Sequence, residues 1–228
     1  MYDYQRSYQE YGITTAQRGA LMGKVLGLLG FAFLFTAGGA IIGRALGPAG
    51  MIISIIGSIG MLITLYFVKE KSPVNLVVMY AFATFEGMML GLVLESYLAR
   101  GLGAAVLNAA ATTGVVTLAA GAYGYTTKRD LTGFGNVLTF GLIALVVASL
   151  IGFVMSFFMT MSFFFLILAG VSAVLFTGFL VYDLNQVAQA TSATEGDAIL
   201  FSVRIYLDIF NLFLALLQIF GFFSSSDD

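Results

Sequence analysis

Long apolar stretches separated by short polar ones run through most of the chain. A helix needs roughly 20 apolar residues to cross the hydrocarbon core of a bilayer, and we count seven stretches of about that length. The pattern therefore predicts an all-α polytopic membrane protein, a bundle of seven transmembrane helices. The predicted spans are Val25–Leu46, Met51–Val68, Val74–Leu94, Ala104–Tyr125, Val137–Phe157, Ser162–Tyr182 and Ile205–Phe223.

The connections between these spans are short, and only the polar stretch NQVAQATSATEGDA before the last span is longer. We therefore expect one transmembrane domain over residues 25–223, with a polar cytoplasmic tail over residues 1–24 and a short polar tail over residues 224–228. Glycines four residues apart in the first and third spans would let neighbouring helices approach closely. These glycines are Gly39, Gly43, Gly47, Gly87 and Gly91.

The composition agrees with a membrane protein and limits its chemistry. Hydrophobic residues make up 60% of the chain and charged residues 10%, which leaves too little polar surface for a soluble domain. The sequence has no histidine and no cysteine, which excludes a Ser-His-Asp triad, a HExxH zinc site and thiolate chemistry. We therefore expect no enzyme and no bound cofactor. A net charge of −2 with dispersed Lys and Arg indicates no nucleic-acid partner.

The basic residues are unevenly distributed between the two sides of the predicted bundle. When the spans are threaded alternately through the bilayer, eight basic residues fall on the side of the N-terminus and two on the other side. Basic residues favour the cytoplasmic side, so we expect a cytoplasmic N-terminus. The eight are Arg6, Arg18, Lys24, Lys69, Lys71, Lys128, Arg129 and Arg204, and the two are Arg44 and Arg100.

Two aspartates lie beside strongly apolar runs, where a charge is expensive and rarely incidental. Asp183 lies in VYDLNQ at the end of the sixth span, and Asp208 lies in IYLDIFNLF near the start of the seventh. Threading brings both to a similar depth on the cytoplasmic side, so the two side chains can meet. In the last span, a stripe with spacings of four, three, four and three predicts a polar face toward the bundle interior. The stripe consists of Arg204, Asp208, Asn211, Ala215 and Gln218.

An aspartate pair in a partly dry site has a characteristic chemistry. Two carboxylates within hydrogen-bonding distance tend to share one proton, so the pair is a candidate pH sensor in a protein without histidine. When deprotonated, the pair offers oxygen ligands to Ca²⁺, and Asn185 and Asn211 could add carbonyl oxygens. This set falls short of the about six to eight ligands of a tight calcium site, which favours a transient permeation site.

A purely structural explanation of the same charges stays open. Arg204 precedes Asp208 by four residues on the same helix face and could neutralise it. Asp183 could lie far enough out to be a solvated helix end. In that case neither carboxylate would have a role in ion movement.

Two glutamates lie in the third span. Glu86, in FATFEGMMLG near its middle, is the most deeply placed acid, which favours a pathway or gating role over a protonated structural hydrogen bond. Glu95 lies at the end of the same span near Arg100, and we expect a surface ion pair there.

Four segments carry a family resemblance: VYDLNQ, IYLDIFNLFLALLQIFG, EGMMLGLVLE and GYTTKRDLTGFG. They resemble the transmembrane Bax inhibitor motif family, and in particular its bacterial members. The resemblance covers the second to seventh spans and leaves the polar N-terminal tail outside. The segment in the seventh span is the most specific of the four.

The resemblance implies a seven-helix bundle with the last helix at its centre, and a pH-sensitive calcium leak that an aspartate pair controls. By motif, the two family aspartates correspond to Asp183 and Asp208. An arginine that latches the pair in some members has no clear counterpart, and Arg204, Lys69 and Lys71 are candidates. The resemblance also favours a leak that is active near neutral pH and reduced in acid.

We therefore predict a cation leak channel, with Asp183 and Asp208 as pH sensor, ion gate and transient Ca²⁺ ligands. The residues expected along the pathway or in a latch are Glu86, Arg204, Asn211 and Asn185. The expected partners are the lipid bilayer, Ca²⁺ and protons, and the expected location is a bacterial inner membrane.

Two alternatives stay open. Some bacterial relatives lack the aspartate of the last helix and are associated with a membrane-bound AAA protease, so a non-conducting regulator of such a partner is one alternative. A proton-coupled solute carrier is the other.

Overall fold

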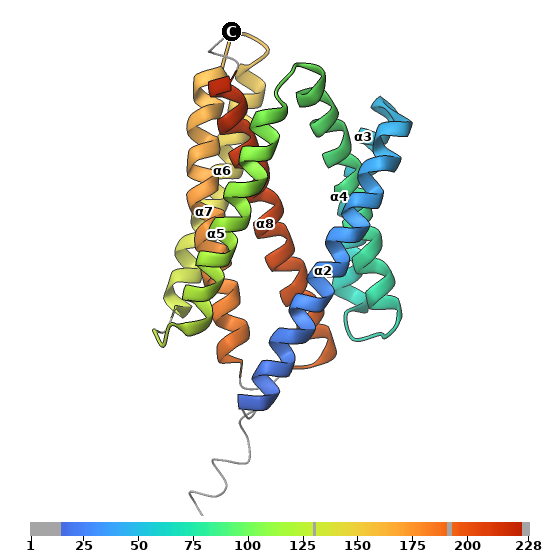
Figure 1. The fold of residues 1–228 in the computed structure, drawn as a ribbon, viewed down its shortest axis with the longest axis vertical. Coiled ribbons are helices and arrows are strands. Elements are labelled where there is room, and N and C mark those ends of the chain that lie inside the picture. The colour runs from blue at the N-terminus through green and yellow to red at the C-terminus, as the bar shows by residue number, and fades with distance from the viewer. Residues whose placement is uncertain (1–14, 130, 191–192, 225–228) are drawn as a thin grey trace, which may run out of the picture. The chain divides into compact units, whose positions relative to one another are not determined.

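A computed structural model describes residues 15–129, 131–190 and 193–224 of the chain (Figure 1). These described ranges contain seven α-helices and no strand. Each helix is long and apolar enough to cross a membrane, which confirms the predicted all-α membrane class. The helices are α2 (Thr15–Leu46), α3 (Pro48–Val68), α4 (Val74–Ala99), α5 (Gly103–Thr126), α6 (Thr132–Met155), α7 (Ser162–Gln189) and α8 (Glu195–Ser224).

The helix ends differ from the predicted spans most clearly at three places. α2 begins at Thr15, so part of the stretch expected as a polar tail is helical. α7 continues to Gln189 and α8 begins at Glu195, so the long connection predicted between them is reduced to residues 190–194. The reason is that hydropathy marks where a helix leaves hydrocarbon, whereas hydrogen bonds and end caps decide where it stops.

The start of α8 shows such a cap. Thr194 Oγ1 accepts a hydrogen bond from the backbone N–H of Asp197 at 3.1 Å, and Asp197 Oδ2 accepts one from the N–H of Thr194 at 2.9 Å. This reciprocal pair is a capping box. Glu195 and Asp197 also place negative charge in the first turn, where the helix dipole favours it. The polar stretch predicted as a loop therefore contains the start of a helix.

The described residues form two compact units. Unit 1 takes the residues up to Glu95 together with Gln186–Arg204, and unit 2 takes Ser96–Asn185 together with the residues from Ile205 onward. α7 and α8 therefore each contribute to both units.

In unit 1, α2 and α4 pack with their backbones in direct contact. A Cβ atom on any of four glycines would overlap the facing backbone, so this approach requires glycine at all four positions. The contacts are Gly39 with Thr84, Gly43 with Met88, Gly87 with Thr36, and Gly91 with Ala40. The close approach predicted from the glycine spacing is confirmed for these four. Gly47 instead adopts a φ of 58° in the turn between α2 and α3.

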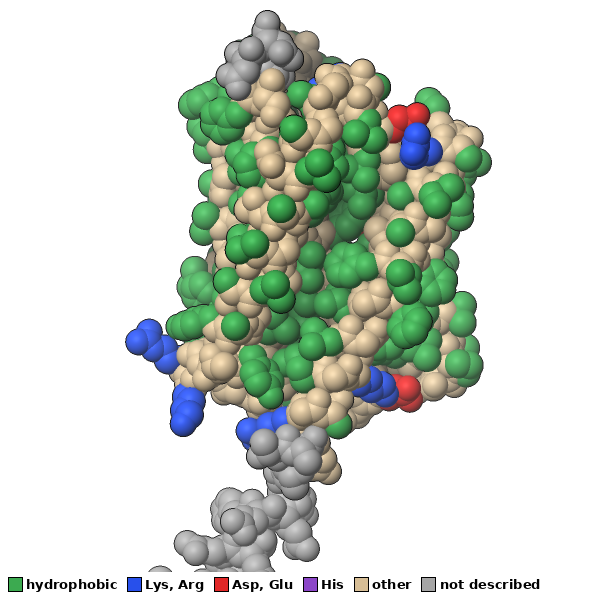
Figure 2. Space-filling model, in the orientation of Figure 1, with side chains coloured by type: hydrophobic (Ala, Val, Ile, Leu, Met, Phe, Trp, Pro, Cys, Tyr) green, Lys and Arg blue, Asp and Glu red, His purple; other side chains and the backbone are tan. Residues whose placement is uncertain are grey.

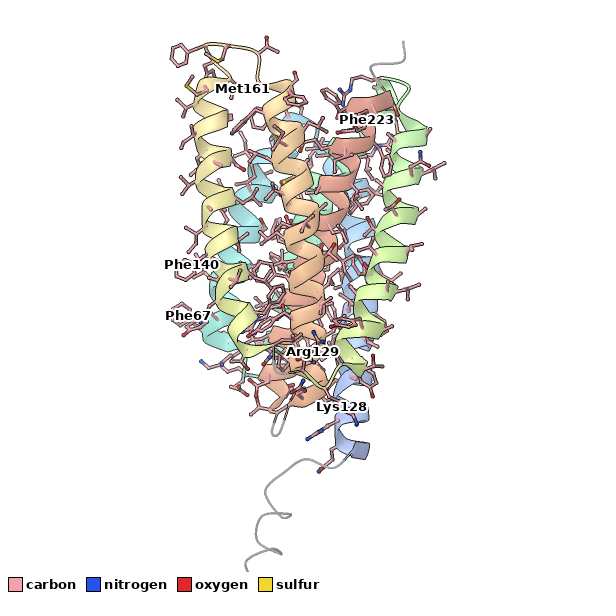
Figure 3. All side chains as sticks on the ribbon, turned by 90° about the vertical axis from the view of Figure 1, so that its left-hand side faces the viewer. Phe67, Lys128, Arg129, Phe140, Met161 and Phe223 are labelled. Atoms are coloured by element: carbon pink, nitrogen blue, oxygen red, sulfur yellow. The ribbon has the colours of Figure 1, made fainter. Side chains whose placement is uncertain are left out.

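In unit 2, α5, α6, α7 and the part of α8 from Ile205 onward lie side by side (Figure 3). Gly124 of α5 lies against the backbone of Val181 in α7, and Gly135 of α6 lies against the ring of Tyr182. α7 thus contacts α5 and α6 through the two residues that directly precede the aspartate of VYDLNQ.

Apolar side chains cover the outer flanks of the helices, and charged side chains lie near the helix ends (Figure 2). Leu118, Val174 and Phe140 are 77%, 76% and 74% exposed. Lipid covers such side chains at membrane depth, so their exposure is that of an integral membrane protein. α8 is the most buried helix. In its most apolar segment 50% of the residues are buried, whereas the corresponding share is 17–39% in the other six helices.

Candidate functional site

Asp183 and Asp208 are both buried in unit 2, where they are 4% and 5% exposed. α7 continues to Gln189 and α8 begins at Glu195, so neither aspartate lies at a helix end. Asp183 is therefore not a solvated residue at a helix end. The sequence argument placed the two aspartates at similar depth by assuming that one helix ends near Asp183 and the next begins near Asp208. The observed helices extend beyond both points, so the contact between the two carboxylates stays a prediction.

A cavity of about 160 Å³ lies between α6, α7 and α8 in unit 2. It has room for several water molecules, since each takes about 30 Å³ in the liquid. Its polar lining side chains are Ser149, Ser172, Asn211 and Gln218, and its apolar ones are Phe165, Leu168, Ala169, Phe176, Leu214 and Ala215. We call this space the α6–α8 cavity.

The helix faces that line the α6–α8 cavity are the faces that carry the two aspartates. In α7, Ser172 and Phe176 precede Asp183 by 11 and 7 residues, which is about three and two whole turns. In α8, Asn211 follows Asp208 by three residues and is its neighbour on the helix surface. Both carboxylates therefore lie along the continuation of the cavity walls.

The polar stripe of α8 faces the interior only in its middle. Asp208 and Ala215 are each 5% exposed and Asn211 is half-buried. Arg204 and Gln218, at the two ends of the stripe, are exposed. The predicted inward face is therefore confirmed for its centre. Gln218 is exposed but still lines the α6–α8 cavity, whereas Arg204 is exposed near the start of α8, where a long side chain can reach polar surroundings.

Arg204 occupies different surroundings from Asp208. Its guanidinium carbon lies 5.9 Å from the ring centroid of Phe201, one turn earlier on the helix. An exposed guanidinium over an aromatic ring does not share the buried environment of the carboxylate. Neutralisation of Asp208 by this arginine stays an open alternative.

Asn185 is buried, and its amide connects α7 to the end of α5. Nδ2 donates hydrogen bonds to the carbonyl oxygens of Gly124 at 3.0 Å and Thr127 at 3.3 Å. The last carbonyls of a helix have no partner within the helix, so this side chain supplies one. Asn185 therefore has a structural role that its sequence position did not indicate.

Asn211 is half-buried in the wall of the α6–α8 cavity. Its Nδ2 donates to the carbonyl oxygen of Leu207 at 2.8 Å, one turn earlier in α8. This bond uses the donor end of the amide. Asn211 thus lies where the sequence placed it, on the same face as Asp208.

Glu86 lies in the middle of α4 in unit 1 and is half-buried. Ser58 of α3 is a hydrogen-bond partner of its side chain. The serine hydroxyl also lies 3.4 Å from the carbonyl oxygen of Ile55. Glu86 therefore has a polar neighbour on the adjacent helix, and its role in a pathway stays a prediction.

Glu95 forms its ion pair with a different arginine from the one expected. Its Oε2 lies 3.8 Å from Nε of Arg44, while Arg100 donates from Nε to the carbonyl oxygen of Ser96 and lies over the ring of Tyr97. The expected Arg100 partner is therefore wrong, because neighbours on another helix are not visible in local spacing.

Two serines of the α6–α8 cavity were missed by sequence reasoning. Ser149 and Ser172 each lie within a long apolar run and show no motif. The signal that could have found Ser172 is its spacing of eleven residues from Asp183, which places both on one helix face. Among the residues that the structure describes, no three Asp, Glu, His or Cys side chains gather into a metal site.

The described residues define an integral membrane protein with seven long apolar helices and with two buried carboxylates on the helix faces that line a cavity. The family model "Inhibitor of apoptosis-promoting Bax1" matches residues 18–225, and the chain belongs to this family. The predicted membership is therefore confirmed.

Relatives of the chain occur in bacteria and in a mammal. An uncharacterized protein of Helicobacter pylori is 35% identical over 173 residues, 75% of this chain and 72% of the relative. Protein lifeguard 4 of Mus musculus is 35% identical over 173 residues, 75% of this chain and 68% of the relative. The protein of Escherichia coli K12 named Modulator of FtsH protease YccA is 28% identical over 175 residues, 77% of this chain and 76% of the relative.

Proposed function

We propose that this protein is a pH-sensitive leak for Ca²⁺ in a bacterial inner membrane, with Asp183 and Asp208 as its gate. The observation that supports the proposal best is the burial of both carboxylates on the helix faces that line the α6–α8 cavity. A buried carboxylate is costly unless it is compensated, so two of them at membrane depth indicate a functional site.

The gate would act through the charge of the pair. With one shared proton, a hydrogen bond between the carboxylates would hold α7 and α8 together. Loss of that proton would place two negative charges beside each other, and their repulsion would separate the helices while attracting a cation. In this proposal the lock is the pair itself rather than a salt bridge to Arg204. The leak would then be small in acid and larger near neutral pH.

Reconstitution tests this proposal directly. The purified protein is placed in liposomes that contain a calcium dye, and Ca²⁺ entry is followed across a pH series. We expect entry that rises with pH and that stays above the level of protein-free liposomes. A flat trace at the protein-free level at every pH would remove the channel function.

A second function is supported by one of the relatives. The Escherichia coli relative is named for modulation of the FtsH protease, and we propose as the alternative that this chain binds a membrane-bound AAA protease without conducting ions. Addition of the reconstituted protein to a purified protease of this class would then change the degradation rate of a membrane substrate. Asp208→Asn separates the two functions, because a leak needs this carboxylate whereas a binding surface elsewhere does not.

A further inference from the structure

The α6–α8 cavity reaches the surface near the ends of its helices. Gln218 is exposed and precedes the end of α8 at Ser224 by six residues, whereas Asn211 is half-buried and lies thirteen residues from that end. At 1.5 Å per residue, these side chains lie about 9 Å and about 20 Å from the helix end. In unit 2, Met161 and Phe223 mark this end, and Lys128 and Arg129 mark the opposite one (Figure 3).

We propose that the α6–α8 cavity is a water-filled vestibule that holds a hydrated cation between the membrane surface and the two aspartates. The proposal rests on the proposed leak and assigns it an entrance. The residues that would contact the cation or its water are Ser149, Ser172, Asn211 and Gln218.

The chemistry of the lining fits a cation that keeps part of its water. Hydroxyl and amide oxygens are ligands that hard cations accept in place of water. No Lys or Arg lies in α6, in α7 or in α8 beyond Arg204, so no positive side chain of these segments opposes entry. Polar side chains at membrane depth must face protein or water, and four of them converge on this one space.

A contact at the mouth of the vestibule orients one of these amides. Nε2 of Gln218 donates to the backbone carbonyl oxygen of Phe165 at 3.4 Å, which connects α8 to α7. The donor end of the amide is thereby engaged, and its Oε1 is the atom that suits a cation. Asn211 repeats this arrangement at the inner end, since its Nδ2 donates to Leu207.

The inner end of the vestibule is apolar on the side of α7. Phe176 is 9% exposed and Leu180 is fully buried, and both lie between Ser172 and Asp183 along this helix. The ring centroid of Phe176 lies 6.1 Å from that of Phe179. Apolar side chains along an ion path block ions by excluding water. In this structure the vestibule therefore ends before the aspartate of α7.

Cysteine accessibility tests the vestibule without any measurement of ion flux. The chain has no cysteine, so Ser172→Cys or Ser149→Cys introduces a single thiol by exchange of one oxygen for sulfur. Small thiosulfonate reagents of either charge are added to the protein in liposomes, and the labelled fraction is followed by mass spectrometry. We expect both thiols to react, and to react faster with the cationic reagent than with the anionic one.

Two serines of the same chain provide matched controls. Ser202 of α8 is fully buried and donates to the carbonyl oxygens of Val25 and Ala198, so Ser202→Cys should stay unlabelled. Ser156 follows α6 and is exposed, so Ser156→Cys should react with both reagents at similar rates.

The outcomes separate the vestibule from the leak. Labelling of both cavity thiols as slow as that of Ser202→Cys would overturn the vestibule even if Ca²⁺ flux is found. Equal rates with the two reagents would overturn its assignment to cations. Fast cation-preferring labelling in a protein that shows no Ca²⁺ flux would support the vestibule and remove the leak. If one serine variant fails to fold, the other decides the result, since they lie on different helices.

Discussion

Asp183 of α7 and Asp208 of α8 are 4% and 5% exposed, and each lies on the face of its helix that lines the α6–α8 cavity. This relationship places the two carboxylates on the helix faces that continue the walls of one cavity, although 24 residues separate them in the sequence. It also makes their contact measurable, because the chain has no cysteine that would interfere with cross-linking.

The first prediction concerns the distance between the two aspartates. Cysteines at both positions, Asp183→Cys with Asp208→Cys, should form a cross-link with a short thiol reagent, since their helix faces converge on one cavity. The measurement is the fraction of cross-linked protein after proteolysis between α7 and α8. Asp183→Cys with Phe223→Cys is the control, because Phe223 lies about 22 Å further along α8 than Asp208 and should give no product. Failure of the first pair with every reagent length would argue against the aspartate pair.

The second prediction concerns pH. Flux through the parent protein should rise with pH, by at most about tenfold per pH unit when a single proton is lost. Asp183→Asn or Asp208→Asn should flatten this variation, because each leaves one ionisable partner. Ca²⁺ entry into liposomes across a pH series measures the effect. Asp197→Asn is the control, since Asp197 belongs to the cap of α8 and its loss should keep the pH profile. Unaltered profiles in both folded aspartate variants would exclude the gate.

The third prediction concerns Glu86 of unit 1. Glu86→Gln keeps the shape of the side chain and its hydrogen bonding but removes its charge, so flux should fall severalfold while the yield of folded protein is unchanged. Glu95→Gln is the matched control at the exposed end of the same helix and should leave flux unaltered. Normal flux in Glu86→Gln would assign this glutamate a structural role with Ser58.

The fourth prediction concerns Asn185 and the end of α5. Asn185→Ala removes the donor for the carbonyl oxygens of Gly124 and Thr127, which should lower the free energy of unfolding by about 1–3 kcal/mol. Thermal unfolding in detergent measures the loss. Asn211→Ala removes a bond to its own helix only and should destabilise less. Equal losses in the two variants would contradict the role of Asn185 as a connection between helices.

The fifth prediction concerns the contact between α2 and α4. A side chain at Gly43 would overlap the backbone of Met88, so Gly43→Leu should destabilise the fold by at least about 1–3 kcal/mol. Gly30→Leu on the same helix is the control, because nothing lies within 4 Å of a Cβ placed there. Comparable thermal stability of the two variants would show that the glycine contact does not hold α2 against α4.

The class of protein followed from the sequence alone, and so did the choice of Asp183 and Asp208 as candidate functional residues. Seven apolar runs of sufficient length predict seven membrane helices because the thickness of the bilayer fixes how many residues a helix needs to cross it. Glycine spacing predicted that neighbouring helices approach closely, because a periodic gap in side chains is a local property of one helix, and the structure shows that the partners are α2 and α4. The two aspartates were recognisable because a charge among apolar residues is locally anomalous.

The tertiary structure alone decided which polar residues share a space. Ser149 and Ser172 became part of a site only when α6, α7 and α8 packed together, and Asn185 gained its partners only from the end of α5. Glu95 found Arg44 on another helix rather than the nearby Arg100. Such relations depend on how helices are rotated about their axes, which is set by the packing of whole faces. Local spacing along a single helix does not contain that rotation.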